Sequence, residues 1–186
     1  MPTPSVYPPI NTMHRQTNLM ANQAFNTDIP LFRDVPADRL ARIEADCQTR
    51  HYQPDDVIFH EGDPGTVLYL IRAGQVRIFV NGLDGSETSV ILFGRTGDIF
   101  GELAVIDGMP RSATAVALTQ TTLAIMNRDT FRRHMQRCPQ LALNFMRELS
   151  RRVRYNTRQM DSLVTLSISQ RLARKLLHLA QDYGLV

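Results

Sequence analysis

The sequence predicts an α+β fold in which an antiparallel β-roll, or jelly-roll barrel, has short flanking helices and a long C-terminal helix. Two observations support this fold class. Between residues 57 and 126, six short β-rich runs alternate with turn signals, and closely spaced short strands are typical of antiparallel barrels rather than parallel sheets. Before and after this stretch, apolar residues recur every three or four positions, which indicates amphipathic helices.

The N-terminal part of the chain is expected to hold one short helix behind a mobile leader. Residues 1–26 are rich in Pro, Asn and Thr and show no periodicity, which is typical of an unstructured leader. Pro36 and Asp38 favour a helix start, and Leu40 and Ile43 give this helix an apolar side. The β-rich runs follow it at residues 57–59, 67–71, 76–80, 88–93, 112–118 and 123–126.

Helical patterns return after residue 126. Asn127 is a suitable N-cap for a short helix that ends near Arg137, and Pro139 can open a long helix. In the long helix a heptad seam alternates spacings of three and four residues: Met146, Leu149, Val153, Asn156, Met160 and Leu163. This pattern predicts a homodimer through residues 141–164. A single amphipathic helix packed on its own barrel would give the same stripe.

Composition narrows the class of protein. The chain of 186 residues has a formal net charge of +3 and two cysteines, neither in a C-x-x-C pair. We therefore expect reduced thiols and no iron–sulfur centre. Neither a long apolar stretch nor a secretory pattern is visible, so we expect a cytoplasmic protein with no membrane partner. Bases gather between Arg128 and Arg158, which indicates either a surface near nucleic acid or a solvated helix face.

No pattern in the sequence suggests catalysis. We find no Ser-His-Asp set, no metal-ligand spacing and no paired catalytic carboxylates, so we expect a binding protein with no catalytic residue and no metal. The isolated histidines do not exclude haem, but such residues are usually at the surface or structural: His51, His60, His134 and His178.

The most informative stretch is FGELAVIDGMPRSAT at residues 100–114, which carries the acid Glu102 and the base Arg111. Gly101 allows a ligand close to the backbone, and residues 104–106 look like one helical turn whose N–H groups suit an anion. Arg111 can hold phosphate oxygens in a bidentate manner, and Glu102 can accept hydrogen bonds from hydroxyls. The pair predicts a ribose phosphate ligand. A Glu102–Arg111 salt bridge that ties the loop together is the alternative.

FGELA at residues 100–104 and PRSATAVA at 110–117, after the lead-in GDIFGE, resemble the phosphate-binding cassette of cyclic-nucleotide-binding domains. Over residues 28–183 the order of helix, roll and long helix is similar to the Crp/Fnr family of transcription regulators. The resemblance implies that Gly101, Glu102 and Leu103 line the ribose, with Glu102 on the 2′-hydroxyl. It also implies that Arg111 and the Ser112 hydroxyl hold the cyclic phosphate.

The long helix carries the residues that would read the base. In the family a Thr-Ser pair of this helix touches the purine, and Asn156 and Thr157 occupy those places here. Asn in place of Thr changes the donor and acceptor pattern. A polar residue in a heptad seam also has a structural role, because it fixes the register of the two helices. Base contact and register therefore both stand as readings of Asn156.

The resemblance also implies a division of the chain. Residues 27–138 would form the cyclic-nucleotide-binding roll, residues 139–165 the dimerisation helix, and residues 166–186 the first helix of a truncated winged helix-turn-helix domain. The implied protein is a dimeric transcription regulator with cAMP, or cGMP, as its allosteric effector. A full-length form would bind promoter DNA through residues not present here. The alternatives are a cyclic-nucleotide-binding module acting on a non-DNA effector such as a kinase, and a family member that responds to another ligand.

Overall fold

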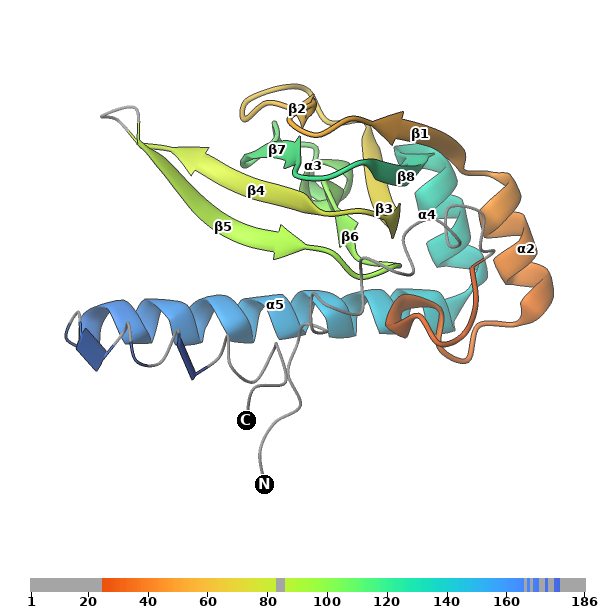
Figure 1. Ribbon diagram of the computed structural model, residues 1–186. Helices are drawn as coiled ribbons and strands as arrows, with labels where there is room; N and C mark the ends of the chain where they lie inside the picture. Colours follow the sequence, from red (N-terminus) through yellow and green to blue (C-terminus); the bar gives the residue numbers. More distant parts are fainter. Residues whose placement is uncertain are drawn as a thin grey trace.

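The computed structural model describes residues 25–82, 86–165, 167, 169–170, 173 and 176–177. It confirms the expected fold class, because eight strands form two four-stranded antiparallel sheets with short helices beside them and a long helix after them (Figure 1). The predicted leader, apart from residues 25 and 26, lies outside the described residues. So do most of the helix expected at 166–186 and the side chains of Met160 and Leu163 in the seam.

The helical elements are η1 (Pro30–Phe32), α2 (Ala37–Ala45), α3 (Glu102–Asp107), α4 (Arg128–Arg137) and α5 (Pro139–Thr165). The strands are β1 (Gln48–Tyr52), β2 (Val57–Phe59), β3 (Val67–Ala73), β4 (Val76–Asn81), β5 (Glu87–Phe93), β6 (Ile99–Phe100), β7 (Thr114–Ala117) and β8 (Thr121–Asn127). One sheet has the order β1-β8-β3-β6 and the other β2-β7-β4-β5. Figure 1 shows α5 running along the roll on the side of β5.

The core has two parts, one between the sheets and one under the helices. Between the sheets, the rings of Phe59, Tyr69, Phe93 and Phe100 stack in a series with centroids 5.0 to 6.1 Å apart. Two of these rings reach the start of α3, since a Cβ atom on Gly101 would lie 3.2 Å from Tyr69 and 3.3 Å from Phe59. The residues around Gly101 therefore rest on packed aromatic side chains.

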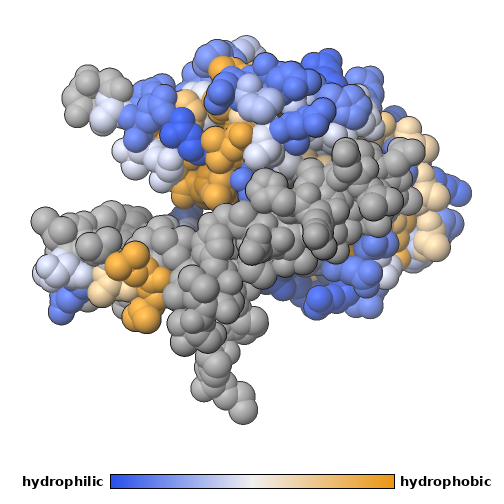
Figure 2. Space-filling model, in the orientation of Figure 1, coloured by the Kyte–Doolittle hydropathy of each residue, from blue (hydrophilic) through white to orange (hydrophobic). Residues whose placement is uncertain are grey.

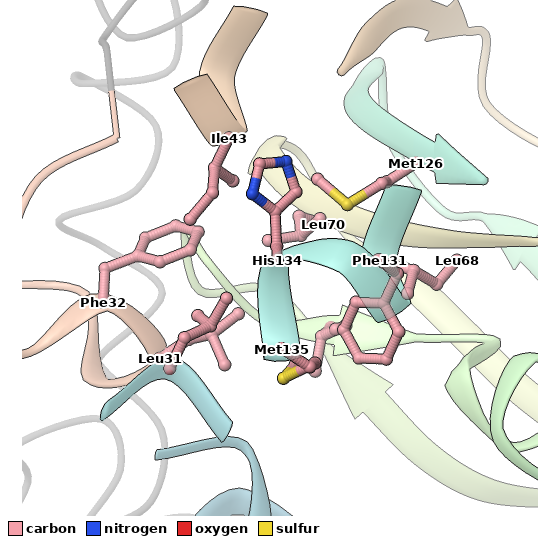
Figure 3. A pocket seen from close by; sticks show the side chains of 11 residues that line it. Leu31, Phe32, Ile43, Leu68, Leu70, Met126, Phe131, His134 and Met135 are labelled. Carbon is pink, nitrogen blue, oxygen red and sulfur yellow. The ribbon is translucent and has the colours of Figure 1, made fainter. Parts of the chain in front are cut away.

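Under the helices, apolar residues of η1, α2, α4 and α5 pack against the outer face of the β3–β8 pair. A cavity of about 20 Å³ remains there, lined by Phe32, Leu68, Phe131, Met135 and further apolar side chains, with His134 at its wall (Figure 3). An apolar space of this size stays dry and holds nothing larger than a water molecule. It is a packing gap of the helical layer.

The sequence patterns predict the helices better than the strands. Asn127 is an N-cap as expected, since its side chain accepts a hydrogen bond of 2.9 Å from the amide of Thr130. β1 and β6 are not predicted. β1 reads QTRHY and is exposed except for its last residue, so it lacks the apolar alternation that reveals a strand. β6 has only two residues, and its pairing with β3 is visible only in three dimensions.

Both cysteines are free thiols. Cys138 is buried, and burial raises the pKa of Cys47 to about 12. Because the thiolate is the reactive species, Cys47 stays protonated and unreactive at neutral pH. No helix within the described ranges is both long enough and apolar enough to cross a membrane.

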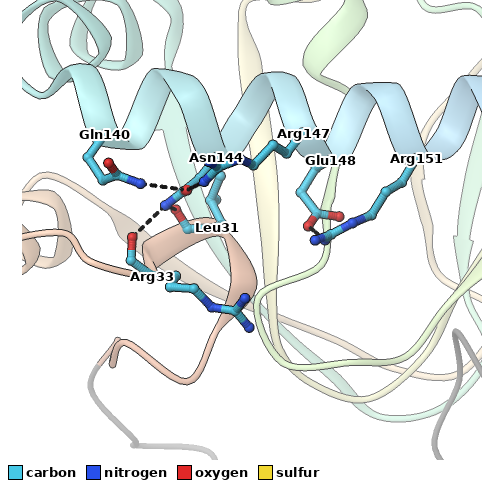
Figure 4. A network of polar contacts seen from close by, with 7 residues as sticks. All are labelled: Leu31, Arg33, Gln140, Asn144, Arg147, Glu148 and Arg151. Atoms are coloured by element: carbon cyan, nitrogen blue, oxygen red, sulfur yellow. Dashed lines mark hydrogen bonds and ion pairs between the residues drawn. The ribbon is translucent and has the colours of Figure 1, made fainter. Parts of the chain in front are cut away.

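The first turns of α5 are fixed to η1 by a buried asparagine. The Nδ2 of Asn144 donates to the carbonyls of Leu31 at 3.1 Å and Arg33 at 2.6 Å, and its Oδ1 accepts from Gln140 and Arg147 (Figure 4). The residue is 2% exposed, and its bond to the carbonyl of Leu31 is buried while the other three are partly buried. Asn144 thereby sets where α5 begins its course along the roll.

Replacing Asn144 with leucine should lower the free energy of unfolding by about 2 kcal/mol, because the carbonyls of Leu31 and Arg33 lose their donor in a buried place. Urea unfolding followed by circular dichroism measures this change. Gln136→Leu, at an exposed position of α4, is the control and should leave the midpoint within error. A wild-type midpoint for Asn144→Leu would mean that the network does not hold α5.

Candidate functional site

The candidate site is built around α3, which lies between two glycines. Gly101 precedes the helix with φ of +68° and Gly108 ends it with φ of +78°, both in the left-handed region that favours glycine. A Cβ atom on Gly101 would also lie 2.7 Å from Nη1 of Arg111. The glycine therefore lets the chain turn sharply between β6 and α3 while Arg111 approaches its backbone.

Arg111 is buried at the centre of the site, with 5% of its surface exposed. Its Nη1 donates to the carbonyl of Gly101 at 2.6 Å and its Nη2 to the carbonyl of Val67 at 2.8 Å. The guanidinium lies 4.3 Å from the ring centroid of Phe59. Burial lowers the pKa of Arg111, yet a guanidinium keeps its charge at neutral pH. Its Nε is buried without a hydrogen-bond partner, so this buried cation has a donor that the protein does not satisfy.

Gly65, in the loop between β2 and β3, completes the close packing. A Cβ atom there would overlap the Cβ of Ala104 and lie 3.1 Å from Cζ of Arg111. In the sequence Gly65 is only part of a turn signal, and nothing local reveals that α3 packs against it. We call Gly65, Gly101, Glu102 and Arg111 together the α3 cluster.

Glu102, the first residue of α3, is 5% exposed and has its ion pair with α5. Its Oε1 accepts from Nη1 of Arg152 at 2.8 Å, and Nη2 of Arg152 donates to the carbonyl of Ile99. The same guanidinium lies 4.9 Å from the ring centroid of Phe93. The alternative Glu102–Arg111 salt bridge is therefore not the pairing that the structure has.

The sequence does not single out Arg152, because it is one of many bases in the stretch from Arg128 to Arg158. Apart from the half-buried Arg128, the other arginines of that run are exposed, namely Arg132, Arg133, Arg137, Arg147, Arg151, Arg154 and Arg158. Arg152 precedes Asn156 by four residues, one helical turn. That spacing was the available signal that Arg152 shares a side of α5 with a predicted site residue.

The remaining predicted residues lie around or beyond the α3 cluster. Leu103, at 46% exposed, and Ser112 are both at the surface next to it. Asn156 and Thr157 are exposed on α5, one turn past Arg152, and the Thr157 hydroxyl donates to the carbonyl of Val153 at 3.0 Å. The structure thus brings Gly101, Glu102 and Arg111 together, and it leaves Asn156 and Thr157 outside the cluster.

The helix α3, bounded by two glycines, begins with the buried acid Glu102 and lies beside the buried cation Arg111. This pair of groups is chemically suited to a small anion that also carries hydroxyl groups. Residues 49–138, which contain the whole of α3 and its flanking glycines, match the family described as "Cyclic nucleotide-binding domain". The chain is also similar to complete regulators. The "CRP-like cAMP-activated global transcriptional regulator" of Mycobacterium tuberculosis is 31% identical over 154 residues, which are 83% of this chain and 68% of the relative.

Two further matches, a curated relative and a solved structure, are both from Thermus thermophilus. The "Cyclic AMP receptor protein" is 35% identical over 153 residues, 82% of this chain and 70% of the relative. The crystal structure of the catabolite activator protein is 35% identical with a TM-score of 0.66, and the match covers 72% of this chain and 62% of that chain. The chain therefore belongs to the CRP-like, or Crp/Fnr, family and contains a cyclic nucleotide-binding domain. It spans less than two thirds of the solved Thermus chain.

The domain is also shared with kinase regulators. The "cAMP-dependent protein kinase regulatory subunit" of Aspergillus niger is 36% identical over 111 residues, 60% of this chain and 26% of the relative. The likeness to that protein is therefore shorter than the likeness to the CRP-like regulators.

Proposed function

We propose that this chain is the effector-binding and dimerisation part of a transcription regulator, and that its effector is a cyclic nucleotide, most readily cAMP. The observation that supports the ligand most directly is Arg111, a buried cation with an unpartnered Nε beside α3. The names of the relatives from Mycobacterium tuberculosis and Thermus thermophilus, which specify cAMP, support this choice of base.

The α3 cluster suits the two polar groups of such a ligand. The Nε–H and a remaining Nη–H of Arg111 would donate to the cyclic phosphate, and the adjacent Ser112 hydroxyl would add a third donor. Glu102 has one carboxylate oxygen on Arg152 and a second that can accept from the ribose 2′-hydroxyl. Gly101 and Leu103 would line the ribose. The ligand would be held without any covalent change to it.

The response would be a shift between conformations of α5. Glu102 contacts Arg152 directly, so a ribose that engages Glu102 changes the partners of α5 on the roll. In a dimer joined through residues 141–164, this would alter how two α5 helices present the DNA-binding parts of a full-length form. For such a shift, the ligand must bind one arrangement of the α5 helices more tightly than the other.

A second candidate is a regulatory module that acts on a kinase, and the Aspergillus niger relative favours it. That match spans 111 residues, whereas those with the CRP-like regulators span 153 and 154. The longer alignment supports the transcription regulator.

Calorimetric titration of the purified chain with cAMP, cGMP and 5′-AMP tests the proposal. We expect micromolar binding of a cyclic nucleotide with one site per chain, and at least tenfold weaker binding of 5′-AMP, whose dianionic, open phosphate has a different shape. Absence of binding for both cyclic nucleotides would contradict the proposed ligand. Equal binding of all three would indicate a general phosphate site instead.

Replacing Asn156 with alanine should change the ratio of the cAMP and cGMP affinities by about tenfold, because a side-chain hydrogen bond to the base is worth about 1 kcal/mol or more. The measurement is the same titration for both nucleotides. Arg158→Ala, an exposed residue further along α5, is the control. An unchanged ratio would assign Asn156 to the register of the helix pair.

A further inference from the structure

Arg128 is the first residue of α4 and follows β8 directly. Its amide donates to the carbonyl of Thr66 at 2.9 Å. Its Nη2 donates to two further carbonyls, that of Gly65 at 3.0 Å and that of Ala104 at 2.7 Å. One residue therefore holds the loop between β2 and β3 and the middle of α3 at the same time.

These two carbonyls belong to the segments that enclose Arg111. Gly65 is packed so tightly against Ala104 that a Cβ atom would overlap it, and the same Cβ would lie 3.1 Å from Cζ of Arg111. Ala104 follows Glu102 by two residues in a helix of only six. If Arg128 lost its bonds to the carbonyls of Gly65 and Ala104, the distance between the β2–β3 loop and α3, which lie on either side of Arg111, would thus change.

The positive charge of Arg128 should also favour binding of an anion at the α3 cluster. Its Nε is buried without a hydrogen-bond partner and its Nη2 binds two neutral carbonyls, so no described ion pair neutralises this second cation beside the α3 cluster. A poorly hydrated positive charge close to a site raises the affinity of that site for an anion. A guanidinium can bind two carbonyls from one nitrogen in a fixed plane, which the single ammonium of lysine reproduces only in part.

Arg128 also joins the site to the C-terminal helices. Two described hydrogen bonds join α3 to these helices, one from Arg128 in α4 to the carbonyl of Ala104 and one from Arg152 in α5 to the carboxylate of Glu102. α4 leads into α5 across Cys138 alone. A displacement of α3 can therefore reach α4 through Arg128, in parallel with the direct contact of Glu102 with Arg152 in α5.

We propose that Arg128 is a positioning residue of the nucleotide site, which holds α3 and Gly65 at the spacing that Arg111 needs and transmits occupancy of the site to α4. The proposal rests on the cyclic nucleotide as ligand. It assigns no contact between Arg128 and the nucleotide, because the side chain acts through the backbone of Gly65 and Ala104.

The test compares Arg128→Gln, Arg128→Lys and the control Arg132→Gln, an exposed arginine of the same helix. Calorimetric titration with cAMP and cGMP gives the dissociation constant and the number of sites separately. We expect Arg128→Gln to raise the dissociation constant by about tenfold or more, with the number of sites unchanged, and Arg128→Lys to give an intermediate value. Arg132→Gln should match the wild type.

A merely structural role would lower the number of sites or the unfolding midpoint and leave the dissociation constant of the folded fraction unchanged. Hydrogen exchange with and without nucleotide gives a second readout. In the wild type the ligand should protect the first turn of α4, and in Arg128→Lys it should protect α3 but not α4.

The experiment separates failure of the positioning role from failure of the proposed function. If Arg128→Gln does not fold, Arg128→Lys provides the test. A wild-type dissociation constant and wild-type protection of α4 in Arg128→Lys would overturn the positioning role of Arg128. If the wild type itself binds neither nucleotide, the proposed function fails, and the positioning role fails with it.

Discussion

Replacing Arg111 with leucine should weaken cyclic-nucleotide binding by at least about a hundredfold, since truncating one partner of a buried charge pair costs about 3 kcal/mol or more. Arg111 is 5% exposed, and its Nε has no hydrogen-bond partner in the protein, so the phosphate would be the acceptor for this N–H. Without Arg111 the negative charge of the ligand would lie in a buried place without the cation that contacts it, since Arg128 donates to the carbonyls of Gly65 and Ala104 instead. Calorimetric titration against the wild type measures the loss.

Arg111 also has a structural task, which the experiment must separate. Its two Nη atoms satisfy the carbonyls of Gly101 and Val67, so the leucine variant should lose about 1 to 3 kcal/mol of stability as well. Arg111→Lys keeps the charge but not both bonds, and Arg132→Leu removes an exposed arginine as a control. Titration well below the unfolding temperature reports affinity alone. Wild-type affinity in folded Arg111→Leu would mean that the phosphate is bound elsewhere.

The part of the site that the sequence predicts is the part that is contiguous. Gly101, Glu102 and Arg111 lie within one stretch of fifteen residues, where the spacing of glycines, acid and base carries the chemistry. The short helix between them and the N-cap of α4 also follow from local rules, because caps and left-handed turns depend on neighbouring residues. Local patterns were sufficient for these features.

The rest depends on contacts between distant segments. Arg152 meets Glu102 across 50 residues and Arg128 meets Gly65 across 63, and in the sequence neither differs from the exposed arginines beside it. Such a contact exists only once the roll has closed and α5 lies along it. Burial, which distinguishes a site arginine from a solvated one, is a property of the fold, and the one-turn spacing between Arg152 and Asn156 does not by itself reveal it.

Replacing Val153 with glutamate should convert a dimer into a monomer at micromolar concentrations. Val153 and Met146 are 64% and 55% exposed on α5 although they occupy seam positions, whereas Leu149 packs partly against the core of its own domain. The roll therefore does not cover this stripe by itself, which disfavours a helix that only packs on its own barrel. In Figure 2, hydrophobic side chains also gather on the side of the roll that faces α5.

At a twofold seam the variant would place two carboxylates close together in an apolar contact, so the dimer dissociation constant should rise by at least about a hundredfold. Sedimentation equilibrium measures it, with Arg154→Glu as the control, since Arg154 is exposed and outside the seam. A monomeric wild type would contradict the heptad argument. A wild-type dimer that Val153→Glu leaves intact would place the interface on another surface. Asn156 belongs to the same heptad seam and is also the proposed contact to the base. Loss of the dimer should therefore also weaken the discrimination between cAMP and cGMP.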